Sequence, residues 1–404
     1  MNSIFQICVE GNTGSTGRIA ESLGILALQQ GWESYIAFGR FPRQSRSNLI
    51  PIGFKRDVFL HGLRTRILDE HCLGSEAATR KLIKKIEETQ PAIIQLHHLH
   101  GYYINIKILF EYLASASIPV VWTFHDCWSI TGHCCHFEFI GCQKWKTECN
   151  QCSQKKEYPA SLIIDRSKEN YYLKKRLFNS VKDMTIVAVS KWLDSVIKES
   201  FLSGIKRKVI YNGIDVDVFK PENRGSIVKS KLNIENKYVL LGVANRWSKH
   251  KGINEFFELS KIIKEDTVIL LIGLSRNQIK GLPKNIIGLK KTENEKELRD
   301  YYEAADIYIN LSVEESFGLT TAEALACGTP AIVYNSTACP EIVDERTGLV
   351  VERQNIEALL HAIDIIKSKG KLYFSTYCRE RAVKFFNKEE RLTEYIELYK
   401  NLLK

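Results

Sequence analysis

EESFGLTTAEALACGTP, residues Glu314–Pro330, joins a buried strand that ends near Leu311 to a helix that begins at about Gly318. The first turn of such a helix exposes backbone N–H groups that suit a phosphate. Glu315 lies in the loop, and Glu323 follows eight residues later, a little over one turn into the helix. The two carboxylates can hold two ends of one ligand, and carboxylates accept hydrogen bonds from paired sugar hydroxyls. Taken singly, a glutamate is more often part of a solvated helix face.

Short apolar strands alternate with helical stretches on both sides of this segment, which is the pattern of parallel βαβ units. In the second half we expect the strands Tyr238–Val243, Thr267–Ile272, Ile307–Leu311 and Pro330–Tyr334. In the first half we expect the strands Ile4–Val9, Ser34–Phe38, Ile93–Leu96, Val120–His125 and Ile186–Ser190. The sequence therefore predicts an α/β fold of two doubly wound, Rossmann-like domains that face a central, ligand-binding cleft.

The chain length sets the domain organisation. At 404 residues the chain exceeds the usual size of a single core, so two domains are expected. The turn-rich segment Asn212–Asp215 marks the change between them. We predict a first domain over residues 1–215, with a Cys-rich insertion at 127–160, and a second domain over 216–384. A C-terminal helix over about residues 385–404 is expected to pack back on the first domain.

The composition excludes several classes of protein. With 44% hydrophobic residues, 26% charged residues and 9 prolines, the chain is neither disordered nor collagenous. No apolar run reaches the roughly 18 residues that cross a bilayer, and the N-terminus lacks a basic, cleavable leader, so we expect a cytoplasmic protein. The net charge of +10 concentrates in Lys155–Lys208, which carries 13 basic and 6 acidic residues. This stretch is compatible with a solvated helix face or with docking on an anionic membrane.

A cationic loop follows the first strand of the second domain. Arg246 and Lys251 lie five residues apart in Ala244–Gly252, across a tight turn that lets both side chains reach one pyrophosphate. A rigid guanidinium fork and a mobile ammonium together form a common phosphate clamp. The alternative for each residue alone is a solvated basic loop.

A glycine-rich turn, Glu10–Arg18, follows the first strand of the chain and opens a helix. Gly14 and Gly17 allow the backbone to approach a phosphate or a sugar closely. The Gly-x-x-Gly-x-x-Gly spacing is not the dinucleotide-binding fingerprint, and a glycine turn alone is weak evidence for any ligand.

Histidines follow two neighbouring strands of the first domain. His125 and Asp126 lie at the carboxyl end of a buried strand, where a histidine can donate to a sugar hydroxyl or transfer a proton. A lone histidine is more often only hydrogen-bonded structure. His97, His98 and His100 follow the preceding strand. Metal binding by this second group is conceivable, but we favour a role in lining the cleft or in capping.

Eleven cysteines are present, and five of them fall in one short stretch. In a reducing compartment such clustering indicates metal binding or reactivity before disulfides. Cys149 and Cys152 have the spacing of a metal knuckle, and Cys134 or Cys135 together with Cys142 would complete a structural zinc site of four thiolates. Free thiols, or two disulfides in an exported chain, are the alternatives.

These motifs, in this order, resemble the retaining GT-B glycosyltransferases of the family 4, or group 1, type. The resemblance covers the glycine loop, the His-Asp pair, the interdomain segment, the Arg-x-x-x-x-Lys-Gly loop and the paired glutamates followed by Ala-Leu-Ala-Cys-Gly-Thr-Pro. It implies an acceptor-side first domain and a donor-binding second domain. It implies catalytic roles for His125, Asp126, Arg246, Lys251 and Glu315. It implies donor contacts from Gly14, Gly17, Arg246, Lys251, Phe317, Gly318, Leu319 and Glu323.

The resemblance also implies a reaction. A hexose would move, with retention of configuration, from a UDP- or GDP-sugar to a saccharide or lipid-linked saccharide in surface polysaccharide biosynthesis. No catalytic metal is expected, because cationic side chains replace it in this family. The sequence departs from the family at Ala338–Glu341, where a Gly-Gly pair is common, and at Trp247. One alternative is a GT-B nucleotide-sugar epimerase. The other is a zinc-containing nucleic-acid-binding protein, but the basic residues do not form a recognisable motif for reading nucleic acid.

Overall fold

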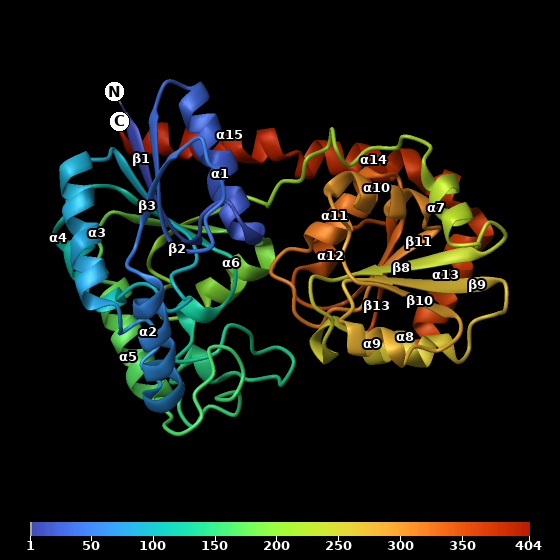
Figure 1. Cartoon of the computed structure of the whole chain (residues 1–404), viewed down its shortest axis with the longest axis horizontal. Helices are drawn as coiled ribbons and strands as arrows, with labels where there is room; N and C mark the ends of the chain where they lie inside the picture. Colours follow the sequence, from blue (N-terminus) through green and yellow to red (C-terminus); the bar gives the residue numbers. More distant parts are fainter. Residues whose placement is uncertain (1) are drawn as a thin grey trace. The chain divides into compact units, whose positions relative to one another are not determined.

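The computed structural model describes residues 2–404 and divides into two compact units (Figure 1). The first unit runs up to Ile210 and includes Leu392–Lys404 from the end of the chain, and the second is Tyr211–Arg391. Backbone hydrogen bonds from Ile214 to Phe386 and from Lys388 to Ile214 tie the start of the second unit to the turn before the last helix. The first unit ends at Ile210, where the sequence predicted residue 215, and the second unit ends at Arg391, where it predicted residue 384.

The first unit is a seven-stranded, all-parallel sheet with the order β3-β2-β1-β4-β5-β6-β7. Its strands are β1 (Ser3–Glu10), β2 (Glu33–Arg40), β3 (Asn48–Pro51), β4 (Ile93–Leu96), β5 (Val120–Phe124), β6 (Met184–Ala188) and β7 (Lys206–Val209). Its helices are α1 (Gly14–Gln29), α2 (Lys55–Leu68), α3 (Glu76–Thr89), α4 (Ile106–Ser115), α5 (Ser167–Phe178) and α6 (Lys191–Lys198). The short 3-10 turns η1 (Trp128–Ile130) and η2 (Lys144–Lys146) interrupt the irregular segment between β5 and α5.

The last helix, α15 (Lys388–Leu402), completes the core of the first unit. Its apolar residues Tyr395, Ile396 and Tyr399 pack in one cluster with Ile4 and other strand residues. The Tyr399 hydroxyl donates to the buried side chain of Gln95 in β4 at 2.7 Å. The C-terminal helix thus packs on the first sheet through both apolar and polar contacts.

The second unit is a six-stranded, all-parallel sheet with the order β10-β9-β8-β11-β12-β13. Its strands are β8 (Tyr238–Val243), β9 (Thr267–Ile272), β10 (Ile286–Leu289), β11 (Ile307–Asn310), β12 (Ala331–Tyr334) and β13 (Gly348–Val351). Its helices are α7 (Gly225–Lys231), α8 (Ile253–Ser260), α9 (Arg276–Lys280), α10 (Glu295–Ala304), α11 (Leu319–Ala326), α12 (Cys339–Ile342), α13 (Ile356–Lys369) and α14 (Lys371–Phe386), with a 3-10 turn, η3 (Lys249–Lys251). The predicted pair of doubly wound α/β domains is confirmed.

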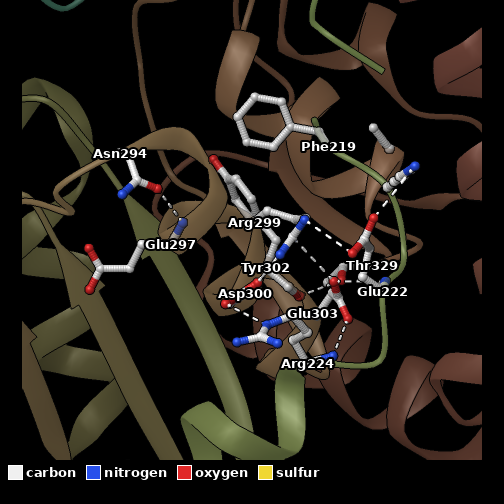
Figure 2. Close-up of polar contacts among 12 residues, drawn as sticks. Phe219, Glu222, Arg224, Asn294, Glu297, Arg299, Asp300, Tyr302, Glu303 and Thr329 are labelled. Carbon is white, nitrogen blue, oxygen red and sulfur yellow. Dashed lines mark hydrogen bonds and ion pairs between the residues drawn. The ribbon is translucent and has the colours of Figure 1, made fainter. Parts of the chain in front are cut away.

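A charged network on α10 holds the segment that enters the second unit. Figure 2 shows Arg299 between Asp300, 2.7 Å away, and Glu222 and Glu303, each 3.6 Å away. The Glu303 carboxylate in turn accepts the backbone N–H groups of Glu222 and Arg224 at 2.9 and 2.8 Å. A largely buried guanidinium with three carboxylates around it fixes this segment against α10.

Within residues 2–404, no helix has the length and apolarity that crossing a bilayer requires.

Candidate active site

Each sheet has one point at which its strand order reverses, and several of the predicted site residues follow the strands beside it. In the second unit the reversal falls between β8 and β11, and in the first unit it falls between β1 and β4. Loops that leave the carboxyl ends of two such strands diverge and open a binding crevice. Lys251 follows β8 and Glu315 follows β11, whereas Gly14 follows β1 and His97 follows β4. Both units therefore place their motifs at the position that doubly wound sheets use for ligands.

Lys251 and Glu315 meet at the reversal point of the second sheet. The Lys251 Nζ lies 2.6 Å from Oε1 of Glu315, and both side chains are only partly exposed. The Glu315 backbone N–H donates to Thr337 Oγ1 at 2.9 Å, which fixes the loop. Directly beside this pair, His250 Nδ1 lies 2.9 Å from Oε2 of Glu314. Sequence reasoning assigned Lys251 and Glu315 to one ligand, and the structure brings them into direct contact.

Glu323 lies on α11, and its carboxylate has a buried partner behind it. The Tyr302 hydroxyl, from α10, donates to Glu323 Oε2 at 2.8 Å. Tyr302 is fully buried, and Thr329 donates to its backbone oxygen at 2.6 Å, as drawn in Figure 2. Because the tyrosine is fully buried, its hydroxyl orients the Glu323 carboxylate from one side.

The start of α11 has the features expected of a phosphate-binding helix terminus. Gly318 is the N-terminal flanking residue, has φ +110°, and offers no side-chain cap to the first turn. That φ value belongs to the region that favours glycine. Phe317 is buried and packs against Tyr211 and Phe386, so it contributes backbone rather than side chain to this surface. Leu319 is the first residue of the helix.

Arg246 lines an open cavity of about 790 Å³ at the carboxyl ends of β8, β9 and β10. Three further cations, Arg276, Lys290 and Lys291, line the same cavity. Trp247 forms part of its wall and is held by a 2.8 Å hydrogen bond from its indole N–H to the backbone oxygen of Ile272. Four basic side chains around one cavity favour an anionic ligand.

The glycine turn of the first unit lies at the start of α1. Gly14 is the first residue of that helix and has φ +63°. A Cβ at Gly17 would come within 2.8 Å of the backbone oxygen of Glu10, so the turn tolerates no side chain there. Thr16, which follows β1, contacts His98, which follows the neighbouring strand β4, with 3.2 Å between Oγ1 and Nδ1. The contact joins the glycine turn to the histidine group after β4.

His125 is partly exposed and ends a hydrogen-bonded chain whose other side chains, His97 and Gln6, are buried. Its Nε2 lies 3.2 Å from Nδ1 of His97, whose Nε2 lies 3.1 Å from Oε1 of Gln6. Gln6 donates its side-chain N–H to the backbone oxygen of Ala20 at 2.8 Å, so its oxygen faces His97. Burial lowers the pKa of His97 to about 3 and that of His125 well below its usual value. Both histidines are therefore neutral near pH 7.

The same contacts assign the proton positions. Gln6 Oε1 can only accept, so the proton of neutral His97 lies on Nε2 and its Nδ1 is an acceptor. His125 must then donate from Nε2, which leaves Nδ1 of His125 without a proton. The chain from Gln6 to His125 thus presents a hydrogen-bond acceptor at the end of β5.

Asp126 is buried, and its oxygens already have partners. Oδ1 accepts the backbone N–H of Trp128 at 2.9 Å, and Oδ2 lies 2.7 Å from His100 Nε2 and 3.4 Å from His98 Nε2. Burial by itself would raise the pKa of Asp126, but His100 and His98 hold it below its usual value. His98, His100 and Asp126 are the one group of three metal-ligand side chains in residues 2–404 whose ligand atoms lie within 4.8 Å of one another.

The four cysteines assigned to zinc line one small cavity of about 20 Å³ together with other residues of the insertion. They are Cys134, Cys142, Cys149 and Cys152. Cys134 and Cys152 share a hydrogen bond, which lowers the pKa of Cys152 to about 7 and raises that of Cys134. Cys135 is buried but does not line this cavity. The sulfurs surround one space, but over residues 2–404 no three of them lie within 4.8 Å of one another.

Several residues of the site were absent from the sequence prediction. Gln6 lies inside an apolar strand, and Tyr302 lies on a helix far from the motif that it supports. Neither residue belongs to a sequence motif that would have indicated a role in the site. Arg276 follows a strand whose end was predicted, so its position could have been noticed, whereas Lys290 follows β10, which was not predicted.

Two sequence families match this chain. The family described as "Glycosyl transferases group 1" matches residues 226–384, and "Glycosyltransferase Family 4" matches residues 17–218. The first match contains the cationic loop and the paired glutamates, and the second contains the His-Asp pair and the end of the glycine turn, Gly17 and Arg18. Together the two matches cover most of the chain in the order that the motifs predicted.

Curated relatives agree with this assignment. The glycosyl transferase WcaC of Escherichia coli K12, named for colanic acid biosynthesis, is 24% identical over 99% of this chain and 100% of its own length. The Escherichia coli UDP-Gal:alpha-D-GlcNAc-diphosphoundecaprenol alpha-1,3-galactosyltransferase is 26% identical over 55% of this chain and 66% of its own.

Solved structures share the fold. Sucrose-phosphate synthase of Thermosynechococcus elongatus superposes with a TM-score of 0.75 at 17% identity, covering 100% of this chain and 99% of its own. Anabaena Alr3699/HepE in complex with UDP gives a TM-score of 0.71 at 15% identity, covering 99% of this chain and 100% of its own. These likenesses confirm the predicted GT-B fold. The fold, the order of the motifs and the two family matches show that the chain belongs to the group 1 glycosyltransferases, of the kind that build polysaccharides.

Proposed function

We propose that the chain is a retaining hexosyltransferase that uses a nucleotide diphosphate sugar and a saccharide or lipid-linked saccharide acceptor in surface polysaccharide biosynthesis. The observation that carries the proposal is the contact between Lys251 and Glu315 at the reversal point of the second sheet. One relative is named for a UDP-galactose donor and a diphosphoundecaprenol-linked acceptor, and one structural neighbour binds UDP-glucose. These names support a nucleotide-sugar donor and a lipid-linked acceptor for this chain.

In this proposal the second unit binds the leaving diphosphate. Lys251 and Arg246 neutralise the negative charge that grows on the diphosphate as the glycosidic bond breaks. The N–H groups of Phe317, Gly318 and Leu319 bind phosphate oxygens, Glu315 binds sugar hydroxyls, and Glu323 binds the ribose. A basic cavity that contains Arg246 is consistent with an anionic donor.

The first unit orients the sugar and the acceptor. Gly14 and Gly17 allow the backbone to approach the donor, and neutral His125 accepts a hydrogen bond from a sugar hydroxyl through Nδ1. Asp126 acts by holding His98 and His100 in place. The acceptor oxygen attacks the anomeric carbon from the face that the diphosphate leaves, and the departing phosphate oxygen takes the hydroxyl proton. Bond making on that face retains the configuration without a protein nucleophile.

The experiment is a product analysis with UDP- and GDP-sugars. We expect nucleoside diphosphate release that depends on an added saccharide or lipid-linked acceptor, and a product whose anomeric configuration by NMR equals that of the donor. An inverted anomer would overturn the retaining mechanism. An epimerised nucleotide sugar formed without acceptor would instead identify an epimerase.

We also propose that the cysteine cavity binds a structural zinc ion. A thiolate is the ligand form of cysteine, and the lowered pKa of Cys152 favours it. Zinc would be held by Cys134, Cys142, Cys149 and Cys152, which line one cavity. The ion would cross-link a segment that has little regular structure.

Zinc content tests this assignment. We expect one zinc ion per chain by plasma mass spectrometry, and its loss in Cys152→Ser together with a fall in the unfolding temperature of about 5 °C or more. Cys135→Ser is the matched control, because Cys135 is a neighbouring buried thiol outside the cavity. Zinc retained in Cys152→Ser, or lost equally in Cys135→Ser, would contradict the ligand set.

A further inference from the structure

Helix α2 exposes its apolar side chains and buries polar ones. Phe59, Leu60, Leu63 and Ile67 are each at least 39% exposed. These positions follow i, i+1, i+4 and i+8, so they form one stripe along the outer side of the helix. The residues that α2 buries are small or polar, namely His61, Gly62 and Thr65. A surface helix of a globular unit normally has the reverse arrangement.

Polar contacts, rather than apolar packing, hold α2 in its unit. His61 Nδ1 lies 2.9 Å from Ser75 Oγ, and His61 Nε2 accepts the backbone N–H of Gly74 at 3.3 Å. Within the helix itself, the buried Thr65 hydroxyl is satisfied by the backbone oxygen of His61 at 2.9 Å. The outward apolar stripe therefore does not serve the packing of the unit, and an exposed stripe of this kind marks an interaction site.

A second apolar segment extends the stripe. Leu162, Ile163 and Ile164 are all exposed, with Leu162 and Ile163 more than half accessible. The backbone N–H of Leu162 donates to the oxygen of Arg66 at 2.8 Å, and that of Ile164 donates to the oxygen of Ile67 at 3.3 Å. These bonds join the segment to the end of α2, whose place at the lower margin of its unit can be followed in Figure 1. The two pieces form one patch, here named the α2 patch and comprising Phe54–Leu68 and Leu162–Ile164.

The charges around the α2 patch are mainly positive. In Phe54–Leu68 and Lys155–Ile164, the exposed charged residues are five basic ones, of which Arg64 is paired with Glu70, against the single acidic Glu157. The basic residues are Lys55, Arg56, Arg64, Arg66 and Lys156. The ammonium of Lys155 also lies at the patch, 3.0 Å from the backbone oxygen of Ile163. Large apolar side chains with a cationic border suit the interface of an anionic bilayer, where the apolar groups enter the headgroup boundary.

We propose that the α2 patch docks on the surface of an anionic lipid bilayer. Phe59, Leu60 and Ile163 enter the boundary between headgroups and acyl chains, while Lys55 and Arg56 contact lipid phosphates. Only the purpose of this docking, which is to bring the enzyme to a lipid-linked acceptor, rests on the proposed function. Binding itself needs neither donor nor acceptor, so it can be measured without turnover.

The test is flotation of the full chain with phosphatidylcholine vesicles that contain or lack phosphatidylglycerol. We expect binding to the anionic vesicles, and a fall of about tenfold or more in the partition coefficient for each of Phe59→Ser and Ile163→Ser. Leu372→Ser is the matched control, because Leu372 is 90% exposed but lies on α14 of the second unit. Replacing Lys55 or Arg56 by Gln should lower binding about fivefold each and reduce its salt dependence.

Three outcomes would overturn the proposal. They are no binding by the unmodified chain, an equal loss in Leu372→Ser, and unchanged vesicle binding in the patch variants. A dimer that dissociates in Phe59→Ser, seen by analytical ultracentrifugation without any vesicle binding, would assign the patch to a second copy of the chain. Thermal unfolding confirms that each variant is folded. Transfer to a water-soluble acceptor should be unchanged in Phe59→Ser, which separates failure of docking from failure of the proposed function.

Discussion

Lys251→Ala should lower kcat by about 10²- to 10³-fold, with a smaller change in KM. The Lys251 ammonium lies 2.6 Å from Glu315, at the point where the second sheet reverses its strand order. Removing it takes away the charge that stabilises the departing diphosphate and leaves a partly buried carboxylate without this partner. Steady-state kinetics with the accepted nucleotide sugar measure both parameters. The loss should fall on kcat, because the diphosphate carries its full charge only as the bond breaks.

Lys249→Ala is the matched control for this prediction. Lys249 belongs to the same 3-10 turn as Lys251 and is exposed, so its removal changes net charge equally. We expect less than about a threefold change in kcat from it, as for a solvated lysine. Equal losses of kcat in both variants would show that the overall positive charge of the loop matters, and not the position of Lys251. Full turnover in Lys251→Ala would refute the proposed clamp.

The central strands of both sheets could be predicted from the sequence, whereas the edge strands could not. The missed strands are β3, β7, β10 and β13, and these are the four outermost strands of the two sheets. Each has four residues and pairs on one side only. The strand Lys206–Val209, with three basic residues, is partly exposed throughout. β3 and β7 lack the continuous apolar run that identifies a buried parallel strand, because polar or basic residues interrupt them. β10 and β13 are apolar, but each is partly exposed and pairs on one side only.

The residues of the candidate site also fall into two groups, one that could be predicted from the sequence and one that could not. Residues in loops after strands, such as Lys251, Glu315 and His125, could be named as candidates because they belong to recognisable motifs. Residues that orient them could not, because their contacts bridge long sequence separations. Gln6 reaches His97 across 91 residues, and Tyr302 reaches Glu323 from a different helix. The proton position on His125 depends on three such contacts, so no local pattern could specify it.

Gln6→Glu should lower turnover about 10²-fold by moving the proton of His125. In the native chain, Gln6 Oε1 accepts from His97 Nε2, and His97 Nδ1 accepts from His125 Nε2. A carboxylate at position 6 would favour a second proton on His97, because it adds a buried negative charge 3.1 Å from Nε2. His97 Nδ1 would then donate to His125 Nε2. His125 would carry its own proton on Nδ1, and the acceptor proposed to face the sugar would become a donor.

Gln95→Glu provides the matched control for this positioning role. Gln95 is also fully buried, lies on the neighbouring strand β4, and bonds Tyr399 and Thr123 rather than a histidine. Both variants introduce one buried carboxylate into the same sheet, so their unfolding temperatures should fall together. Only Gln6→Glu should change the ¹⁵N shifts of the His125 ring and shift the pH profile of kcat. If turnover falls equally in the two variants and the His125 signals are unchanged, the chain from Gln6 to His125 is structural, and the tautomer of His125 has no part in the reaction.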